Sequence, residues 1–139
     1  MAFEFKGVAN MFEGGFAEAE KNAIADALIQ RMMGKYEMIG SGRCRMAFKL
    51  KSGNYVVKVP LSENGEDDNC VESSKQDFGH PVAKARMVVI DGLCCVVMEY
   101  VEHYDGLRED TPEWTSFIDC GQFGYTKKGE LVAYDFGFY

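Results

Sequence analysis

The chain has 139 residues, of which 47% are hydrophobic and 13% aromatic, so it can bury a core and is not a disordered protein. Its 15 Lys and Arg against 22 Asp and Glu give a formal net charge of −7, which argues against binding nucleic acid or anionic membranes through basic patches. No apolar run approaches the roughly 20 residues of a membrane helix, no secretory signal is visible, and the five cysteines contain no CxxC pair, so we expect a cytoplasmic protein with free thiols.

The first predicted element is a helix within an N-terminal extension of residues 1–34. Residues 16–33 carry apolar side chains at helical spacing. These are Ile24, Leu28 and Met32, with Ala19, Ala23 and Ala27 beside them. Gly34 stands where a helix C-cap is expected. We expect the helix to pack on the rest of the protein, the alternative being a detachable helix that binds a partner.

After Gly34 the pattern changes to short strands separated by turn signals. The predicted strands are 36–39, 46–50, 55–59, 86–90 and 93–98, followed by a small hairpin of 125–126 and 130–134. Residues 62–68 are expected to form a polar loop, residues 69–76 a short helix and residues 99–111 an irregular acidic linker. Because strands and helices mix without βαβ regularity, the pattern favours an α+β fold with a twisted, five-stranded antiparallel sheet.

Two segments in the first half of the chain carry candidate chemistry. The segment Ile39-Gly40-Ser41-Gly42-Arg43-Cys44-Arg45 lies between predicted strands, where glycines let main-chain N–H groups approach a phosphate. Lys58 lies on the same strand face as Val56, and its ammonium group needs a partner there. The ordinary alternatives are a simple turn for the first and a lysine that protects an edge strand for the second.

Two acidic residues complete the set. Glu72, on the predicted short helix, is a reasonable counter-ion for Lys58, the alternative being a solvated surface glutamate. Asp135 begins Asp135-Phe136-Gly137 at the end of a predicted strand, where a carboxylate can hold a hard cation such as Mg²⁺. The alternative for this segment is a common turn.

The order of these segments resembles the protein-kinase-like superfamily, and in particular its small divergent members from bacteriophages. The resemblance covers roughly residues 36–137. It implies a minimal kinase-like domain of residues 35–139, with an N-lobe of 35–98, a hinge of 99–110 and a vestigial C-lobe of 111–139 that ends in Asp-Phe-Gly.

The resemblance also implies a role for each candidate residue. ATP would lie against Val56 and the strand-to-hinge passage, which contains Met98, Glu99 and Val101. Its phosphates would be covered by the main chain of residues 40–45, including Gly40 and Gly42. Lys58, held by Glu72, would contact the α- and β-phosphates, while Asp135 and Gln122 would hold Mg²⁺.

Several departures from the family pattern favour a degenerate, binding-only protein over a working kinase. Arg45 replaces the third glycine of the loop, where it would either join the phosphate site or obstruct a nucleotide. No His-Arg-Asp sequence occurs, Phe117 falls where the catalytic base is expected, and Asp119 would need a shifted loop to serve as the base. We expect neither an activation segment nor a helical lobe for a peptide substrate, because the sequence ends two residues after Gly137.

These observations leave three alternative functions, of which the first is the one we expect. The first is a phage-encoded pseudokinase that binds and modulates a host protein, using acidic residues of 62–68 and 99–113. The second is an ATP- and Mg²⁺-dependent phosphotransferase or nucleotidyltransferase that uses Lys58, Glu72 and Asp135. The third is an acidic DNA mimic that inhibits a host protein. A missing helical lobe would leave apolar surface below the hinge, covered either by the N-terminal helix or by a second copy in a homodimer.

Overall fold

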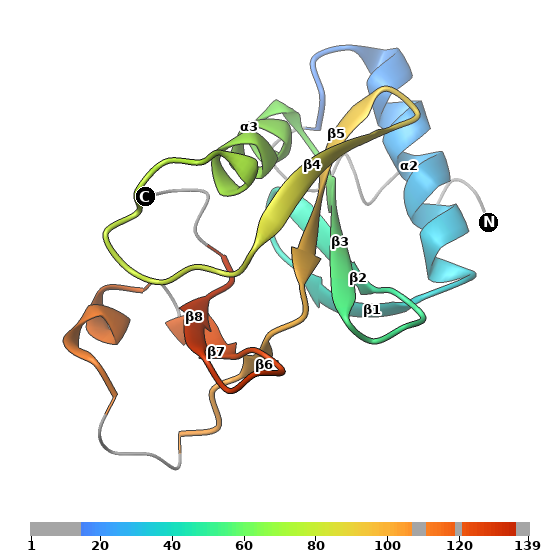
Figure 1. The fold of residues 1–139 in the computed structure, drawn as a ribbon. Coiled ribbons are helices and arrows are strands. Elements are labelled where there is room, and N and C mark those ends of the chain that lie inside the picture. The colour runs from blue at the N-terminus through green and yellow to red at the C-terminus, as the bar shows by residue number, and fades with distance from the viewer. Residues whose placement is uncertain (1–14, 107–110, 119–120, 136–139) are drawn as a thin grey trace.

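A computed structural model of the chain describes residues 15–106, 111–118 and 121–135. Within these residues the protein is an α+β structure with one five-stranded and one three-stranded antiparallel sheet (Figure 1). The helices are α2 (Ala19–Met33), α3 (Glu63–Ser73) and the 3₁₀ helix η1 (Glu113–Phe117). The strands are β1 (Glu37–Ser41), β2 (Arg45–Lys49), β3 (Tyr55–Pro60), β4 (Ala85–Ile90), β5 (Leu93–Glu99), β6 (Glu102–His103), β7 (Phe123–Tyr125) and β8 (Leu131–Ala133). Asp119, Phe136 and Gly137 lie outside the described residues.

The predicted five-stranded antiparallel sheet is confirmed, with the order β1-β2-β3-β5-β4. The β4–β5 hairpin turns at Asp91 and Gly92, whose φ values of 53° and 81° are those of a two-residue hairpin turn. Because β5 lies between β4 and β3, strand β3 has a hydrogen-bonded neighbour on each side. Lys58 is therefore in the middle of the sheet, and the edge-strand explanation of this lysine is wrong.

Helix α2 packs on β2 and β3, as predicted, on the sheet face that carries Phe48 and Val59. Leu28 and Met32 are buried as expected, but Ile24 is 37% exposed. The predicted helix face joins Ile24 to small alanines, which would bury little apolar surface. The face that packs on the core instead carries Ala25, Leu28, Ile29 and Met32. This helix is expected as one possible cover of the apolar surface below the hinge. Helix α2 packs on β2 and β3 instead, so that expectation is wrong.

Helix α3 begins six residues earlier than predicted, at Glu63 rather than residue 69. The predicted polar loop of 62–68 is wrong because Ser62 caps the helix: its hydroxyl accepts a hydrogen bond from the Gly65 amide at 3.3 Å. Glu63 and Glu66 in the first turn also suit the positive end of the helix dipole. With this start, Asp68, Asn69 and Glu72 form one buried face toward the sheet.

The predicted C-terminal hairpin is confirmed as β7 and β8, and it gains β6 from the segment predicted to be irregular. A Cβ atom at Gly124 would lie 1.9 Å from the Glu102 carbonyl oxygen, so glycine permits this pairing. Apolar side chains of the three-stranded sheet form a second core with Val56 and Met98. This packing brings Tyr134 and Asp135 close to β3.

Within the described ranges, no helix has the length and apolarity to cross a membrane.

Candidate functional site

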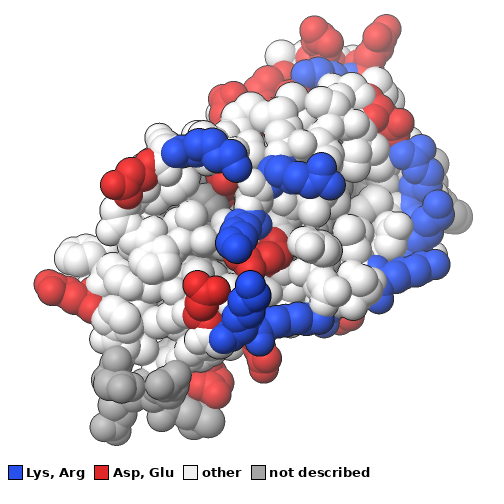
Figure 2. Space-filling model, viewed as in Figure 1, with Lys and Arg blue, Asp and Glu red and all other residues white. Residues whose placement is uncertain are grey.

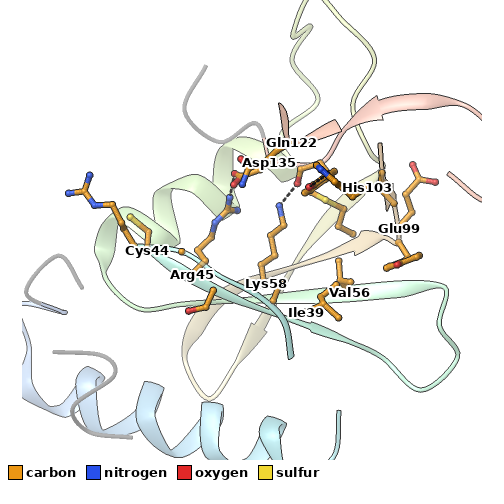
Figure 3. A pocket seen from close by; sticks show the side chains of 18 residues that line it. Ile39, Cys44, Arg45, Val56, Lys58, Glu99, His103, Gln122 and Asp135 are labelled. Carbon is orange, nitrogen blue, oxygen red and sulfur yellow. Dashed lines mark hydrogen bonds and ion pairs between the residues drawn. The ribbon is translucent and has the colours of Figure 1, made fainter. Parts of the chain in front are cut away.

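A cavity of about 760 Å³ lies between the two sheets and is lined by 18 residues (Figure 3). This volume is in the range of small-molecule sites. Ten of the residues predicted for nucleotide or metal binding line it: Gly40, Gly42, Arg45, Val56, Lys58, Met98, Glu99, Val101, Gln122 and Asp135. Glu72 lies directly behind the lining, in contact with Lys58. The sequence pattern therefore located one continuous site, apart from Asp119, whose placement is not described.

One end of the cavity is apolar and has a free main-chain edge. Val56 and Met98 are buried in its wall, and Ile39 reaches it from a β-bulge between Met38 and Gly40 in β1. The Tyr100 amide is already bonded to the Asn54 carbonyl. Among the described residues, none is hydrogen-bonded to the amide or carbonyl of Val101. A flat heterocycle could pack against the apolar wall and pair with this edge.

The other end is an ion-pair network centred on Glu72. The Lys58 ammonium group donates to Glu72 Oε1 at 2.9 Å, which is the predicted pairing. The Arg45 guanidinium group binds the same carboxylate at both oxygens, with Nη1–Oε1 at 2.5 Å and Nη2–Oε2 at 2.9 Å. All three side chains are buried. Glu72 thus neutralises charge from two neighbouring strands at once, in a bidentate geometry that is strong for arginine.

The segment after β8 closes this network from the opposite side. Arg45 Nη2 lies 2.6 Å from Asp135 Oδ1, and the Lys58 ammonium group donates to the main-chain carbonyl of Tyr134. Figure 3 shows Arg45 and Lys58 side by side, both pointing from the sheet toward this segment. Arg45 is therefore a bridge between two carboxylates rather than an open phosphate ligand.

Asn69 is a part of the site that the sequence prediction missed. Its side-chain oxygen accepts from Arg45 Nη1 at 3.1 Å, and its Nδ2 donates to the carbonyls of Lys58 at 3.3 Å and Cys94 at 2.8 Å. Asn69 thus fixes the orientation of the guanidinium group and ties α3 to β3 and β5. The available signal was its position three residues before Glu72, which places both on one helix face.

The network changes the pKa of each member in a direction that its surroundings explain. Burial would raise the pKa of Glu72, but the charges of Lys58 and Arg45 hold it below its usual value. Burial lowers the pKa of Lys58 even though Glu72 opposes that shift. For Asp135, burial raises the pKa against the opposing effect of Lys58 and Arg45. Glu72, which pairs with both cations, is therefore the carboxylate of the network that holds its negative charge most firmly.

These residues do not fit a Mg²⁺ site. Magnesium prefers an octahedron of oxygen ligands, usually with one or two free carboxylates. Asp135 Oδ1 instead accepts from Arg45, so the guanidinium group takes the place that a cation would need. In the part of the chain that the structure describes, no group of three or more His, Cys, Asp or Glu side chains could hold a metal ion. Gln122 lines the cavity but adds only one amide oxygen.

Comparisons with protein-family models, curated proteins and solved structures found no match to this chain. The geometry of the cleft is therefore the basis for assigning a function.

Asp68 is a second buried carboxylate, close to the network but not part of the cavity wall. It is 5% exposed, and its Oδ2 atom has no hydrogen-bond donor among the described residues. Burial raises its pKa to about 6, although Arg45 opposes the shift, while Glu72, Asp135 and Asp67 add to it. Asp68 therefore takes up a proton in the folded state at a pH where the unfolded chain has already lost it.

This makes stability fall as the pH rises from about 4 through 6, because the folded state binds the Asp68 proton more tightly than the unfolded state does. The raised pKa means that ionised Asp68 is unfavourable in the folded state. We expect Asp68→Asn to stabilise the protein by about 1–2 kcal/mol at pH 8 and by much less at pH 4, since the buried amide is always neutral. Urea unfolding at both pH values measures this. Asp77→Asn, at an exposed aspartate that does not contribute to the Asp68 shift, is the control. A gain from Asp68→Asn that is equal at both pH values would contradict the assignment.

Proposed function

We propose that the chain is a kinase-like protein that uses its cleft to bind a ligand without transferring phosphate, and that it modulates a host protein by binding. The observation that carries the proposal is the position of Arg45, whose guanidinium group bridges Glu72 and Asp135 at 2.5 and 2.6 Å. The Arg45 guanidinium group would have to release the Asp135 carboxylate before a metal ion could approach that carboxylate.

Three features of the cleft support the kinase-like interpretation. Lys58 on a central strand pairs with Glu72 on the helix that follows. The glycine-containing segment of 40–44 lines the cavity above them, and Asp135 lies across from Lys58. These are the relations that the resemblance to the kinase-like superfamily implies. They come from four separate parts of the chain, so their convergence favours that interpretation over four unrelated turns and surface residues.

Among the residues that the structure describes, the cleft does not present the groups that phosphoryl transfer requires. That reaction depends on metal ions that neutralise charge on the phosphates and on a residue that positions the attacking group. Arg45 engages the carboxylate expected to hold the metal. Phe117, at the position expected for the base, is a hydrocarbon side chain with 75% of its surface exposed. Binding without chemistry is the function that this arrangement supports best.

The convergence of Lys58, Glu72 and Asp135 also favours a second candidate, an ATP-dependent transferase. Labelled ATP distinguishes the two. We expect the parent chain, given γ-labelled ATP with Mg²⁺ or Mn²⁺, to transfer no label to itself, to water or to proteins of a bacterial lysate above the level of Lys58→Met. Transfer that depends on Lys58 would overturn the binding-only function and support the transferase.

The proposed partner is a host protein, and the surface charge bears on its nature. Figure 2 shows Lys and Arg side chains gathered across the middle of one face, interleaved with Asp and Glu. The mixed charges on this face suit a protein partner there better than they suit DNA mimicry, which requires a continuous array of carboxylates. Capture with the tagged chain from a bacterial lysate should yield one stoichiometric protein, and its absence under several growth conditions would contradict this part of the proposal.

A further inference from the structure

We infer that the cleft selects an uncharged, nucleoside-like heterocycle, binds it without a metal and discriminates against nucleoside triphosphates. This inference rests on the proposed ligand-binding function and names the chemical class of the ligand. It departs from the ATP and Mg²⁺ that the sequence resemblance implies.

The first support is the charge balance of the cleft. The cations in its lining are Arg43, Arg45 and Lys58, and the carboxylates are Glu99 and Asp135, with Glu72 directly behind. Three positive charges thus face three negative ones. Asp68 adds a further negative charge close to Arg45 when it is ionised. A triphosphate would bring several negative charges into a site with no net positive charge to receive them, and transferring unpaired charge out of water is costly.

The second support is that the two deep cations are already engaged. Arg45 Nη1 donates to Glu72 and Asn69, and its Nη2 donates to Glu72 and Asp135. The Lys58 ammonium group donates to Glu72 and to the Tyr134 carbonyl. These bonds use the four Nη hydrogens of Arg45 and two of the three ammonium hydrogens of Lys58. A phosphate entering this end would therefore find one hydrogen left on Lys58 and could pair with the Arg45 Nη atoms only by displacing a carboxylate that is held by the fold. Its electrostatic gain would be offset by the partners it removes.

The third support is the opposite end of the cleft, which offers what a neutral heterocycle needs. Val56, Met98 and Ile39 provide apolar walls. Val101 lines the same end, and its main-chain amide and carbonyl have no hydrogen-bond partner among the described residues. Apolar burial together with a few placed hydrogen bonds is the usual basis of small-molecule binding. The affinity of the cleft therefore comes from the base-like part of a ligand, and phosphates only weaken it.

Calorimetric titration of the parent chain with adenosine, guanosine and their triphosphates tests this, each in MgCl₂ and in EDTA. We expect at least one nucleoside to bind tenfold or more tightly than its own triphosphate, with affinities that Mg²⁺ leaves within twofold. A triphosphate that binds more tightly than its nucleoside, or that requires Mg²⁺, would overturn the inference while leaving the proposed ligand-binding function standing. No binding by any of the four probes at millimolar concentration would overturn both.

A variant then tests whether Arg45 is the cause. Arg45→Met removes the guanidinium group that holds Asp135 Oδ1, and with it one cation, so we expect triphosphate binding to gain a dependence on Mg²⁺ of tenfold or more. Arg86→Met, which removes an exposed arginine from β4, is the matched control and should show no such gain. If Arg45→Met folds, as judged by circular dichroism, and shows no Mg²⁺ dependence, Arg45 is not the selective element and the inference fails. If it does not fold, the titrations of the parent chain decide.

Discussion

Glu72→Gln is expected to be among the most destabilising single substitutions in this protein. Glu72 is the common partner of Lys58 and Arg45, and all three side chains are buried. A neutral amide would leave two cations sharing Asp135 and a carbonyl, and breaking a buried ion pair by removing one partner costs about 3–5 kcal/mol. Because a domain of this size has a total stability of about 5–15 kcal/mol, urea denaturation should show the loss clearly.

Two further variants show whether the loss comes from unpaired buried cations or from a change in packing. Asp67→Asn, on the exposed side of the same helix, should change the free energy of unfolding by less than about 0.5 kcal/mol. Adding Lys58→Met to Glu72→Gln removes one of the two stranded cations and should recover at least about 1 kcal/mol. A loss below about 1 kcal/mol for Glu72→Gln alone would show that the network does not hold α3 on the sheet.

Gly65→Ala is expected to be nearly as damaging, although alanine is the better helix former. A Cβ atom at this position would lie 2.2 Å from the main-chain carbonyl oxygen of Cys44 and 3.1 Å from Pro60 Cα. The same carbonyl accepts the Leu61 amide at 2.7 Å, so it is not free to move away. The gain of about 1 kcal/mol in helix propensity is therefore outweighed, and we expect a net loss of about 2–4 kcal/mol in the free energy of unfolding.

Gly34→Ala is the matched control for this substitution. Gly34 has φ −77° and ψ −15°, which any residue adopts, and its added Cβ would come no closer than 3.6 Å to another atom. Restricting the unfolded chain should then stabilise the protein by up to about 1 kcal/mol. Equal losses for the two variants would mean that close packing of α3 against Cys44 does not govern the effect of Gly65→Ala.

Strand positions were the most predictable part of the fold, because turn signals and alternation are local. Asp91-Gly92 located the β4–β5 hairpin, and the alternation of 46–50 identified the core face of β2. The start of α3 was predictable but missed, since Ser62 followed by acidic residues is a helix N-terminal signal. Strand β6 was not predictable, because it depends on pairing with β7 across about twenty residues.

The candidate site likewise contains residues that were predictable from the sequence and residues that were not. Lys58, Glu72 and Asp135 were identified from residue type and order, and the structure places them around one cavity. The bridging position of Arg45 could not be read from the sequence, because it requires β2, α3 and the segment after β8 to meet at one guanidinium group. The one signal for Asn69 was its position three residues before Glu72, because its bonds to main-chain carbonyls on two strands leave no pattern in the sequence.

The bond between Arg45 and Asp135 joins residues 90 positions apart, and that between Lys58 and Tyr134 joins residues 76 positions apart. By comparison, Lys58 and Glu72 are 14 positions apart. Closing the longer loops costs more chain entropy and favours late formation. During synthesis on the ribosome, Arg45 and Lys58 acquire their last partners only after residues 134 and 135 have emerged. The cleft is therefore complete only once the segment after β8 has packed, and a bound ligand would report that this segment has joined β2 and β3.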